Sequence, residues 1–261
     1  MISSNQIIRT AISLNMMGIK MLERRCHTQA METFHDAIGL LKKDVQMTTS
    51  FIQLDNDDDV SRMVQQQCNA VYDRALRRIS RLEHATILPD LNLEVIRYQN
   101  LNRMNILNNM KLNNDTTLYV MQIQDVDFNE FNSCIMFPVL YYNLGIAYIA
   151  NSQSSIHKTN AASRKSLKSA LKLFRLSYSI CTKLPNSSTE ISMDALQNSE
   201  QIQIMGIVIR GLIHTMNLMK EDETVTHSFC IKFTYLQSFV QDIVESMNTI
   251  FSTNKAAASA A

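Results

Sequence analysis

The chain has 261 residues, of which 46% are hydrophobic and 19% are charged, and its formal net charge at pH 7 is +1. These values are ordinary for a globular protein and exclude the polar, highly charged composition of disordered chains. The near-neutral charge gives no general attraction to nucleic acid or to an anionic membrane, which usually requires a strong basic excess. Only five glycines and three prolines are present, and this favours helices over a fold rich in tight turns.

Two apolar stripes at helical spacing predict an antiparallel helix pair at the start of the chain. The first stripe predicts a helix over residues 6–22, capped by Ser4. The polar segment 23–27 interrupts the pattern, and the second stripe then predicts a helix capped by Thr28. Because the break is short, the two helices should lie side by side as a hairpin.

A third apolar stripe, over residues 60–79, predicts a third helix that follows the acidic segment 55–59. Helical periodicity then fails, and we interpret residues 86–132 as an insertion. Within it the alternation over Leu118–Gln124 predicts a strand, which we expect to belong to a two-stranded β-hairpin. The remainder of the insertion shows no helical or strand periodicity and is predicted to be irregular.

Helical periodicity returns in the second half of the chain and predicts four more helices, over residues 138–151, 160–184, 192–219 and 225–251. Pro138 should begin the first of them, because its missing N–H costs nothing at the first helical position. Residues 256–261 have neither a cap nor a stripe and are expected to form a disordered tail. The sequence therefore predicts one all-α domain over residues 1–255.

An internal repeat links the first helix pair to the second. Gly18 lies mid-helix and is followed by Ala30, Phe34 and Ala37, and Gly145 lies mid-helix and is followed by Ala170, Phe174 and Ser177. The segment around Gly211 shares this pattern more weakly. These spacings resemble the tetratricopeptide repeat (TPR), in which L-G-x2-Y on one helix is followed by A-x3-F on the next. The glycines are too far apart for the family's period of about 34 residues, and the tryptophan position of the motif holds Leu14 and Tyr141.

The resemblance implies a right-handed stack of antiparallel helix pairs whose first helices line a concave groove. In such a fold the groove binds a peptide or a helix of a partner protein. By analogy with the family, four side chains would face that groove: Asn15, Glu23, Tyr142 and Thr215. The chain is similar to divergent, lineage-specific members of the family, which implies a protein–protein interaction or scaffolding role.

Patterns typical of catalytic, metal or cofactor sites are weak. Asp55, Asp57 and Asp59 alternate like calcium ligands, but Val60 stands where the calcium loop needs glycine. Cys26 precedes His27, yet sequence neighbours point apart on a helix and no third orienting group is evident. The chain also lacks a glycine-rich phosphate loop and paired histidines of the H-E-x-x-H type. We therefore expect no enzyme activity, metal, cofactor or small-molecule substrate.

Two basic rows leave an alternative open, an RNA-associated helical-repeat protein. Arg74, Arg77, Arg78 and Arg81 fall on one helix face, and Lys165, Lys168, Lys172 and Arg175 fall on another. No aromatic residues are interleaved for base stacking, so ordinary solvated faces are favoured and nucleic acid is not the expected partner.

The cysteines and the N-terminus bear on localisation. Five solitary cysteines indicate a reducing compartment, and no apolar run approaches the ~18 residues of a membrane span. With no secretory signal evident, we expect a cytoplasmic or nuclear protein without a membrane partner. Organelle import is the alternative, because the first 22 residues contain Arg9 and Lys20 but no acid.

Overall fold

The structure is a computed structural model that describes residues 2–50, 57–81, 93–97, 117–123, 130–153, 160–183, 194–220 and 224–238. These residues are mostly helical and include one small two-stranded sheet. The elements are α1 (Ile2–Glu23), α2 (His27–Ser50), α3 (Asp57–Ser80), β1 (Leu93–Arg97), β2 (Leu118–Gln122), α5 (Glu130–Gln153), α6 (Asn160–Cys181) and α7 (Asp194–Met219). A further helix covers residues 224–238. The predicted all-α character is therefore confirmed.

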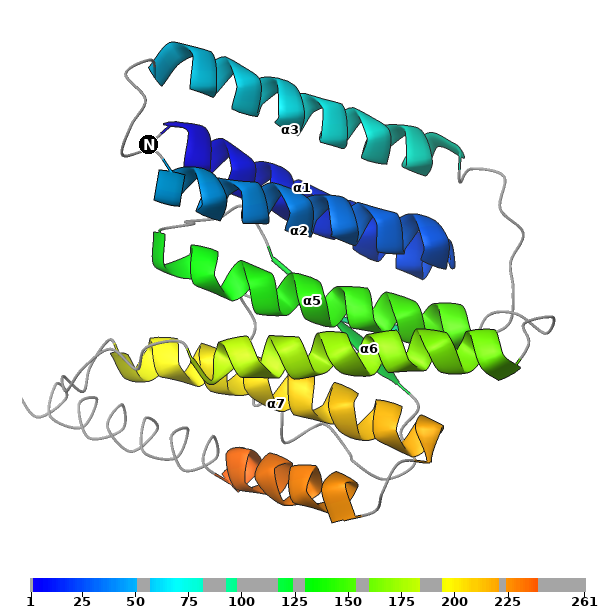
Figure 1. Cartoon of the computed structure of the whole chain (residues 1–261). Helices are drawn as coiled ribbons and strands as arrows, with labels where there is room; N and C mark the ends of the chain where they lie inside the picture. Colours follow the sequence, from blue (N-terminus) through cyan, green and yellow to red (C-terminus); the bar gives the residue numbers. More distant parts are fainter. Residues whose placement is uncertain are drawn as a thin grey trace, which may run out of the picture.

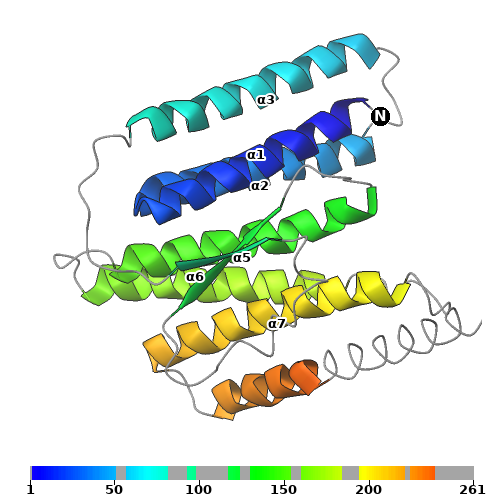
Figure 2. The same cartoon turned by 180° about the vertical axis from the view of Figure 1, so that it is seen from behind.

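The helices form a stack whose order differs from their order in the chain (Figures 1 and 2). α2 packs against α5, α5 against α6, and α6 against α7. The helix over 224–238 lies at one end, where the Phe229 ring meets the Tyr178 ring of α6 edge-on with centroids 5.9 Å apart. α3 lies at the other end and packs mainly against α1, although it follows α2 in the chain. The helices of the second half of the chain therefore join the first half mainly through the contact of α5 with α2.

The turn between α1 and α2 is tighter than the sequence predicts. Arg25 has a φ of 62°, and the amides of Arg25 and Cys26 donate to the carbonyls of Leu22 and Met21 at 2.9 and 2.8 Å. This pair of bonds satisfies carbonyls at the end of α1 in the manner of a Schellman motif. Because the reversal is so short, α1 and α2 lie in contact along their length.

Two of the helix pairs are joined by the same glycine–phenylalanine contact. A Cβ on Gly18 of α1 would lie 2.6 Å from Cε1 of Phe34 of α2, and one on Gly145 of α5 would lie 2.5 Å from Cε1 of Phe174 of α6. Real Cβ atoms do not approach so closely, so only glycine leaves room for the ring. Both phenylalanines are completely buried. Each glycine therefore sets the close approach of its pair.

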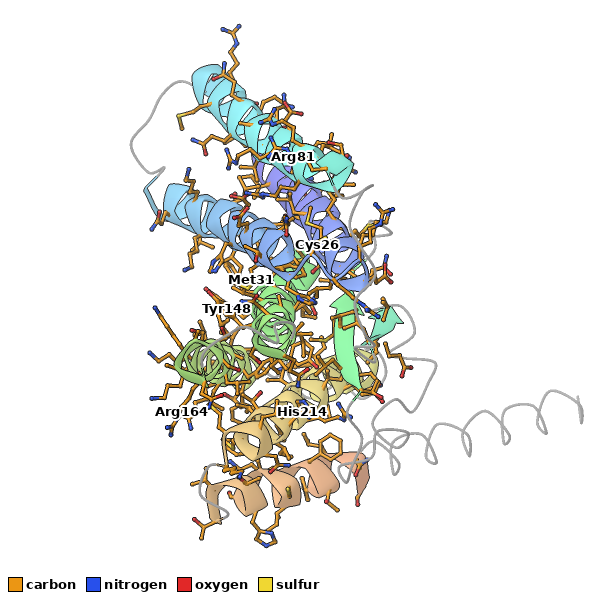
Figure 3. All side chains as sticks on the ribbon, turned by 90° about the vertical axis from the view of Figure 1, so that its right-hand side faces the viewer. Cys26, Met31, Arg81, Tyr148, Arg164 and His214 are labelled. Carbon is orange, nitrogen blue, oxygen red and sulfur yellow. The ribbon has the colours of Figure 1, made fainter. Side chains whose placement is uncertain are left out.

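The predicted hairpin is wrong, because β1 and β2 pair in parallel, with Leu93 opposite Leu118 and Arg97 opposite Gln122. A parallel pair cannot be joined by a tight turn and needs a longer crossover. The predicted strand itself is confirmed as β2. The two strands lie on the side of the stack formed by α1, α5 and α7, away from α2 and α6 (Figure 3).

Pro138 does not begin a helix as predicted, since α5 starts at Glu130 and runs through it. A proline inside a helix removes one backbone hydrogen bond and usually kinks or ends the helix. Burial sustains this one, because the turns on both sides of Pro138 are packed in the core. The Ser177 hydroxyl on α6 also donates to the Pro138 carbonyl at 2.8 Å.

The predicted caps are also displaced. Ser4 lies inside α1, which begins at Ile2. Thr28 lies inside α2, whose first bond runs from the Ala30 amide to the Cys26 carbonyl at 2.9 Å. Both helices begin before the predicted cap, because each extends beyond the N-terminal end of its apolar stripe.

Other predictions are confirmed or lie outside the described residues. The helices predicted over 60–79, 160–184 and 192–219 correspond to α3, α6 and α7. The predicted last helix is present over 224–238, whereas residues 239–251, the tail over 256–261 and most of the insertion over 86–132 lie outside the description.

One segment corrects the expectation about membrane spans. By length and composition alone, Gln201–Met219 is apolar enough to cross a bilayer, and 67% of that stretch is buried among the packed helices. The segment forms most of α7, which packs against α5 and α6. An apolar helix buried in a protein core passes the same compositional test.

Candidate functional site

The candidate site is the face of α1, α5 and α7 on which β2 lies. Asn143 of α5 bonds to both main-chain polar groups of Met121 in β2. Its Oδ1 accepts from the Met121 amide at 2.9 Å, and its Nδ2 donates to the Met121 carbonyl at 2.7 Å. Asn15 of α1 donates to the same carbonyl at 3.1 Å. The Asn143 amide also donates to Oδ1 of Asn15 at 2.8 Å, so the two asparagines support each other.

Both asparagine side chains are completely buried, and the β2 residues from Leu118 to Met121 are buried as well. A buried amide without a partner would cost about 1–3 kcal/mol, and here each polar atom that faces Met121 is satisfied. The bonds go to the main chain and not to a side chain of β2. These bonds therefore fix where an extended segment lies without depending on which side chains it carries.

α7 supplies a third attachment, near the start of β2. Arg210 donates from Nη1 to the Thr117 carbonyl at 2.9 Å, and its guanidinium lies over the Tyr119 ring, 4.4 Å from the centroid. The arginine is buried, and its planar cation suits both a carbonyl and an aromatic face. The segment is thus held by one side chain from each of α1, α5 and α7.

Of the four residues predicted to face a groove, Asn15 lies against the extended strand. Tyr142 is buried instead beside Phe174, with ring centroids 5.2 Å apart. Burial raises the pKa of its hydroxyl far above the ordinary value, although nearby Arg210 acts in the opposite sense, so the phenol stays protonated. Thr215 is buried and donates to the Gly211 carbonyl at 2.7 Å, and Glu23 is exposed. The structure therefore does not gather the four side chains on one open surface.

Sequence reasoning missed Asn143 and Arg210. The repeat places Tyr142, and not Asn143, in the position of Asn15, so the spacing points one residue away from the amide that bonds to Met121. A usable signal was present, since each missed residue is a polar side chain within an apolar stretch. A buried polar group is more informative than an exposed apolar one.

The two predicted basic rows differ in structure. Arg78 makes ion pairs with Glu32 at 2.9 Å and with Asp36 at 2.7 Å, and Arg74 reaches Asp36 at 3.3 Å. These bonds hold α3 against α2. By contrast, the four cations on α6 are exposed, and none of them makes an ion pair with another residue that the structure describes (Lys165, Lys168, Lys172, Arg175).

The thiols of Cys26 and Cys181 are poor nucleophiles. Burial raises the pKa of Cys26, although neighbouring Arg24 lowers it, and its Sγ donates to the Arg24 carbonyl at 3.4 Å. Burial also raises the pKa of Cys181 to about 12. Since the thiolate is the reactive form, these groups are mainly unreactive thiols at neutral pH.

For metals, no group of three His, Cys, Asp or Glu side chains within the described ranges is arranged to hold an ion. The alternating carboxylates of Asp55, Asp57 and Asp59 lie outside the side chains that the structure describes. The sequence matches no protein-family profile, and comparisons with curated proteins and solved structures found no match.

Proposed function

We propose that the chain is a protein–protein interaction or scaffolding module that binds an extended segment of a partner on the face of α1, α5 and α7. The observation that carries the proposal is the recognition of the Met121 peptide by Asn15 and Asn143. Side chains that bond to a peptide group recognise extended conformation, and pockets for alternate side chains then add specificity. Here the chain's own β2 takes these bonds, so a partner segment would take them by replacing β2.

We further propose that the scaffold is TPR-like. The proposal is supported by the repeated contact of Gly18 with Phe34 and of Gly145 with Phe174, which uses the residues that carry the sequence resemblance. In that family the first helices of the pairs line the binding groove. α1 and α5 are the first helices of the two pairs, and both contact β2.

Binding, and not catalysis, is favoured by the chemistry of the face. Its polar side chains, Asn15, Asn143 and Arg210, all bond to main-chain groups or to one another. Two are amides, which do not titrate, and an arginine stays protonated in proteins. None of the three therefore suits proton transfer, whereas all three suit the orientation of a peptide.

A peptide supplied in trans tests the proposal. The probe is a labelled peptide with the sequence of residues 117–123, and binding is followed by fluorescence anisotropy beside a scrambled peptide. In the wild type the tethered β2 competes at an effective concentration of about millimolar, so binding should be weak. Val120→Ala with Met121→Ala weakens the tethered strand, because both side chains are buried, and should raise the affinity at least tenfold.

The control separates the receptor from the tethered strand. Adding Asn143→Ala to the weakened chain should remove the gain, because the peptide then loses its main-chain partner. The exposed substitution Leu176→Ala should leave binding unchanged. If the weakened chain stays folded by circular dichroism and binds the peptide no better than the wild type, the face does not accept a segment in trans and the proposal is wrong.

A second candidate, RNA association, is favoured by the exposed cations of α6. Successive cations at i+3 and i+4 follow one helix face, as a phosphate-tracking surface requires. Lys168→Glu with Lys172→Glu should abolish a salt-sensitive RNA shift. No shift with the wild type at low salt would end this alternative.

A further inference from the structure

A pocket of about 380 Å³ opens between the start of α2 and the end of α3. Its lining is polar and strongly basic, and consists of Thr28, Gln29, Glu32, Arg74, Arg77, Arg78 and Arg81. Figure 3 shows Arg81 at this end of α3. The volume lies within the usual range of small-ligand sites, about 300–1,000 Å³.

The carboxylates at the pocket neutralise only part of its charge. Glu32 and Asp36 are both engaged by Arg78, and Asp36 is shared with Arg74. The side chains of Arg77 and Arg81 make no hydrogen bond or ion pair with another residue that the structure describes. Among the residues that the structure describes, four arginines against two carboxylates leave the guanidinium groups of Arg77 and Arg81 uncompensated, and both line the pocket.

The ion pairs also give the pocket a fixed frame. Arg78 is mostly buried, and its two carboxylate partners and the Thr33 hydroxyl, 3.4 Å away, hold it in place. Bidentate and charge-assisted bonds of this kind restrict an arginine side chain strongly. Arg77 and Arg81 therefore stand beside an anchored neighbour and not on a freely moving helix end.

The start of α2 adds uncharged hydrogen-bond donors, which favour an anion as the arginines do. Thr28 and Gln29 lie in the first turn of α2, where backbone N–H groups have no partner within the helix. The positive end of the helix dipole also favours an anion there. Two guanidinium groups, a hydroxyl, an amide and a helix start thus converge on one cavity.

We propose that this pocket binds a small phosphate-bearing anion, with Arg77 and Arg81 as its principal ligands. Arginine presents planar pairs of N–H groups that match phosphate oxygens. A ligand with two linked phosphates suits the two uncompensated charges. RNA fits less well, because a long phosphate backbone would pass Glu32 and because the lining contains no aromatic side chain for base stacking.

Calorimetric titration of the full chain with inorganic pyrophosphate tests the assignment, with inorganic phosphate as the single-phosphate arm. Arg77→Gln with Arg81→Gln should weaken pyrophosphate binding at least tenfold, because two charge-assisted contacts are lost. The matched control is Lys168→Gln with Lys172→Gln, which removes the same charge from the exposed face of α6 and should leave the affinity within about twofold. Sulfate and chloride at equal ionic strength separate a phosphate site from general screening.

Circular dichroism of the Arg77→Gln, Arg81→Gln variant should match the wild type, because neither side chain contributes to the described ion pairs. Loss of pyrophosphate binding in this folded variant alone supports the assignment. Equal weakening in the α6 control would show a diffuse charge effect and overturn it. The assignment also fails if the wild type binds no pyrophosphate, or if it binds RNA but neither small anion.

Discussion

The α1/α2 and α5/α6 pairs share a scaffold and differ in what the scaffold carries. In both, a glycine on the first helix admits a fully buried phenylalanine from the second. When the pairs are superposed on these residues, Ala11 corresponds to Pro138 and Ala37 to Ser177. Both alanines are completely buried in the first pair, whereas in the second pair Ser177 donates to the Pro138 carbonyl. Because proline lacks the N–H that would bond four residues back, the bond to its own carbonyl adds a contact between α5 and α6 and does not replace the bond that proline removes.

The polar residues of the face do not follow the repeat. Asn15 corresponds to Tyr142, and Asn143 corresponds to Met16, yet both asparagines bond to the Met121 carbonyl. Successive residues on a helix point about 100° apart, so the aligned faces of α1 and α5 are not turned equally toward β2. The repeated spacing reflects the contacts between paired helices and therefore identifies the helix pairs. The residues that hold β2 depend instead on where the strand crosses those pairs.

The largest expected effect concerns the shared phenylalanines. Phe34→Ala and Phe174→Ala should each lower the free energy of unfolding by about 3–5 kcal/mol, measured by urea denaturation. Phe174→Ala should cost more, because its ring also contacts Tyr142 and lies beside Gly211 of α7. The exposed substitution Leu176→Ala should cost under about 0.5 kcal/mol. Equal losses for the two phenylalanines would show that α7 adds nothing to the second pair.

The asparagines should show an unequal loss. Asn143→Ala leaves both polar groups of Met121 without that partner and should cost about 2–4 kcal/mol, whereas Asn15→Ala leaves the Met121 carbonyl bonded to Asn143 and should cost about 1–2 kcal/mol. The double variant should cost less than the sum, because the two side chains also bond to each other. Exposed Asn69→Ala on α3 is the control. Additive losses would contradict a shared network.

Replacing a helical glycine by alanine should destabilise the protein at some positions and stabilise it at others. Gly18→Ala and Gly145→Ala should each destabilise by about 1–3 kcal/mol, because the new methyl meets a buried ring. Gly39→Ala in α2 meets nothing within 4 Å and should stabilise by about 0.5–1 kcal/mol through helix propensity. Phe34→Leu should partly rescue Gly18→Ala. A stabilising Gly145→Ala would remove the argument that glycine sets the approach of α5 and α6.

Much of the scaffold could be predicted from the sequence, because helices and their close contacts leave local signals. The apolar stripes predict α1, α3, α6 and α7, and the repeated spacing around Gly18 and Gly145 resembles that of paired helices. The parallel pairing of β1 with β2 had no such signal, since it joins segments across a long crossover.

The start of α5 was misjudged because a local preference of proline was outweighed by burial on both sides. The face was harder still to predict. Asn143 and Arg210 acquire their roles only when β2 is placed against them, and no pattern within α5 or α7 specifies the position of that strand.

The smallest expected effect lies where the two pairs meet. His35 of α2 lies 3.5 Å from the Tyr148 hydroxyl of α5, with the rings edge-on. Partial burial lowers the pKa of His35 below its ordinary value of 6.5, Asp36 acts against this shift, and Lys42 adds to it. Below pH 6.5 the unfolded state then binds more protons at this site than the folded state does, so the stabilisation is complete above about pH 6.5 and is lost as the pH falls through the folded pKa.

An NMR titration of the His35 ring should give a midpoint below 6.5, and His35→Gln should flatten the difference in unfolding free energy between acidic and neutral pH. The other histidines are the same in both proteins, so the comparison isolates this junction. Tyr148→Phe is the sharper variant, because it keeps the packing of the ring and removes only the hydroxyl. If His35 titrates at or above 6.5, burial at the α2–α5 contact is weaker than the packing indicates, and the two pairs meet more loosely than each is held within itself.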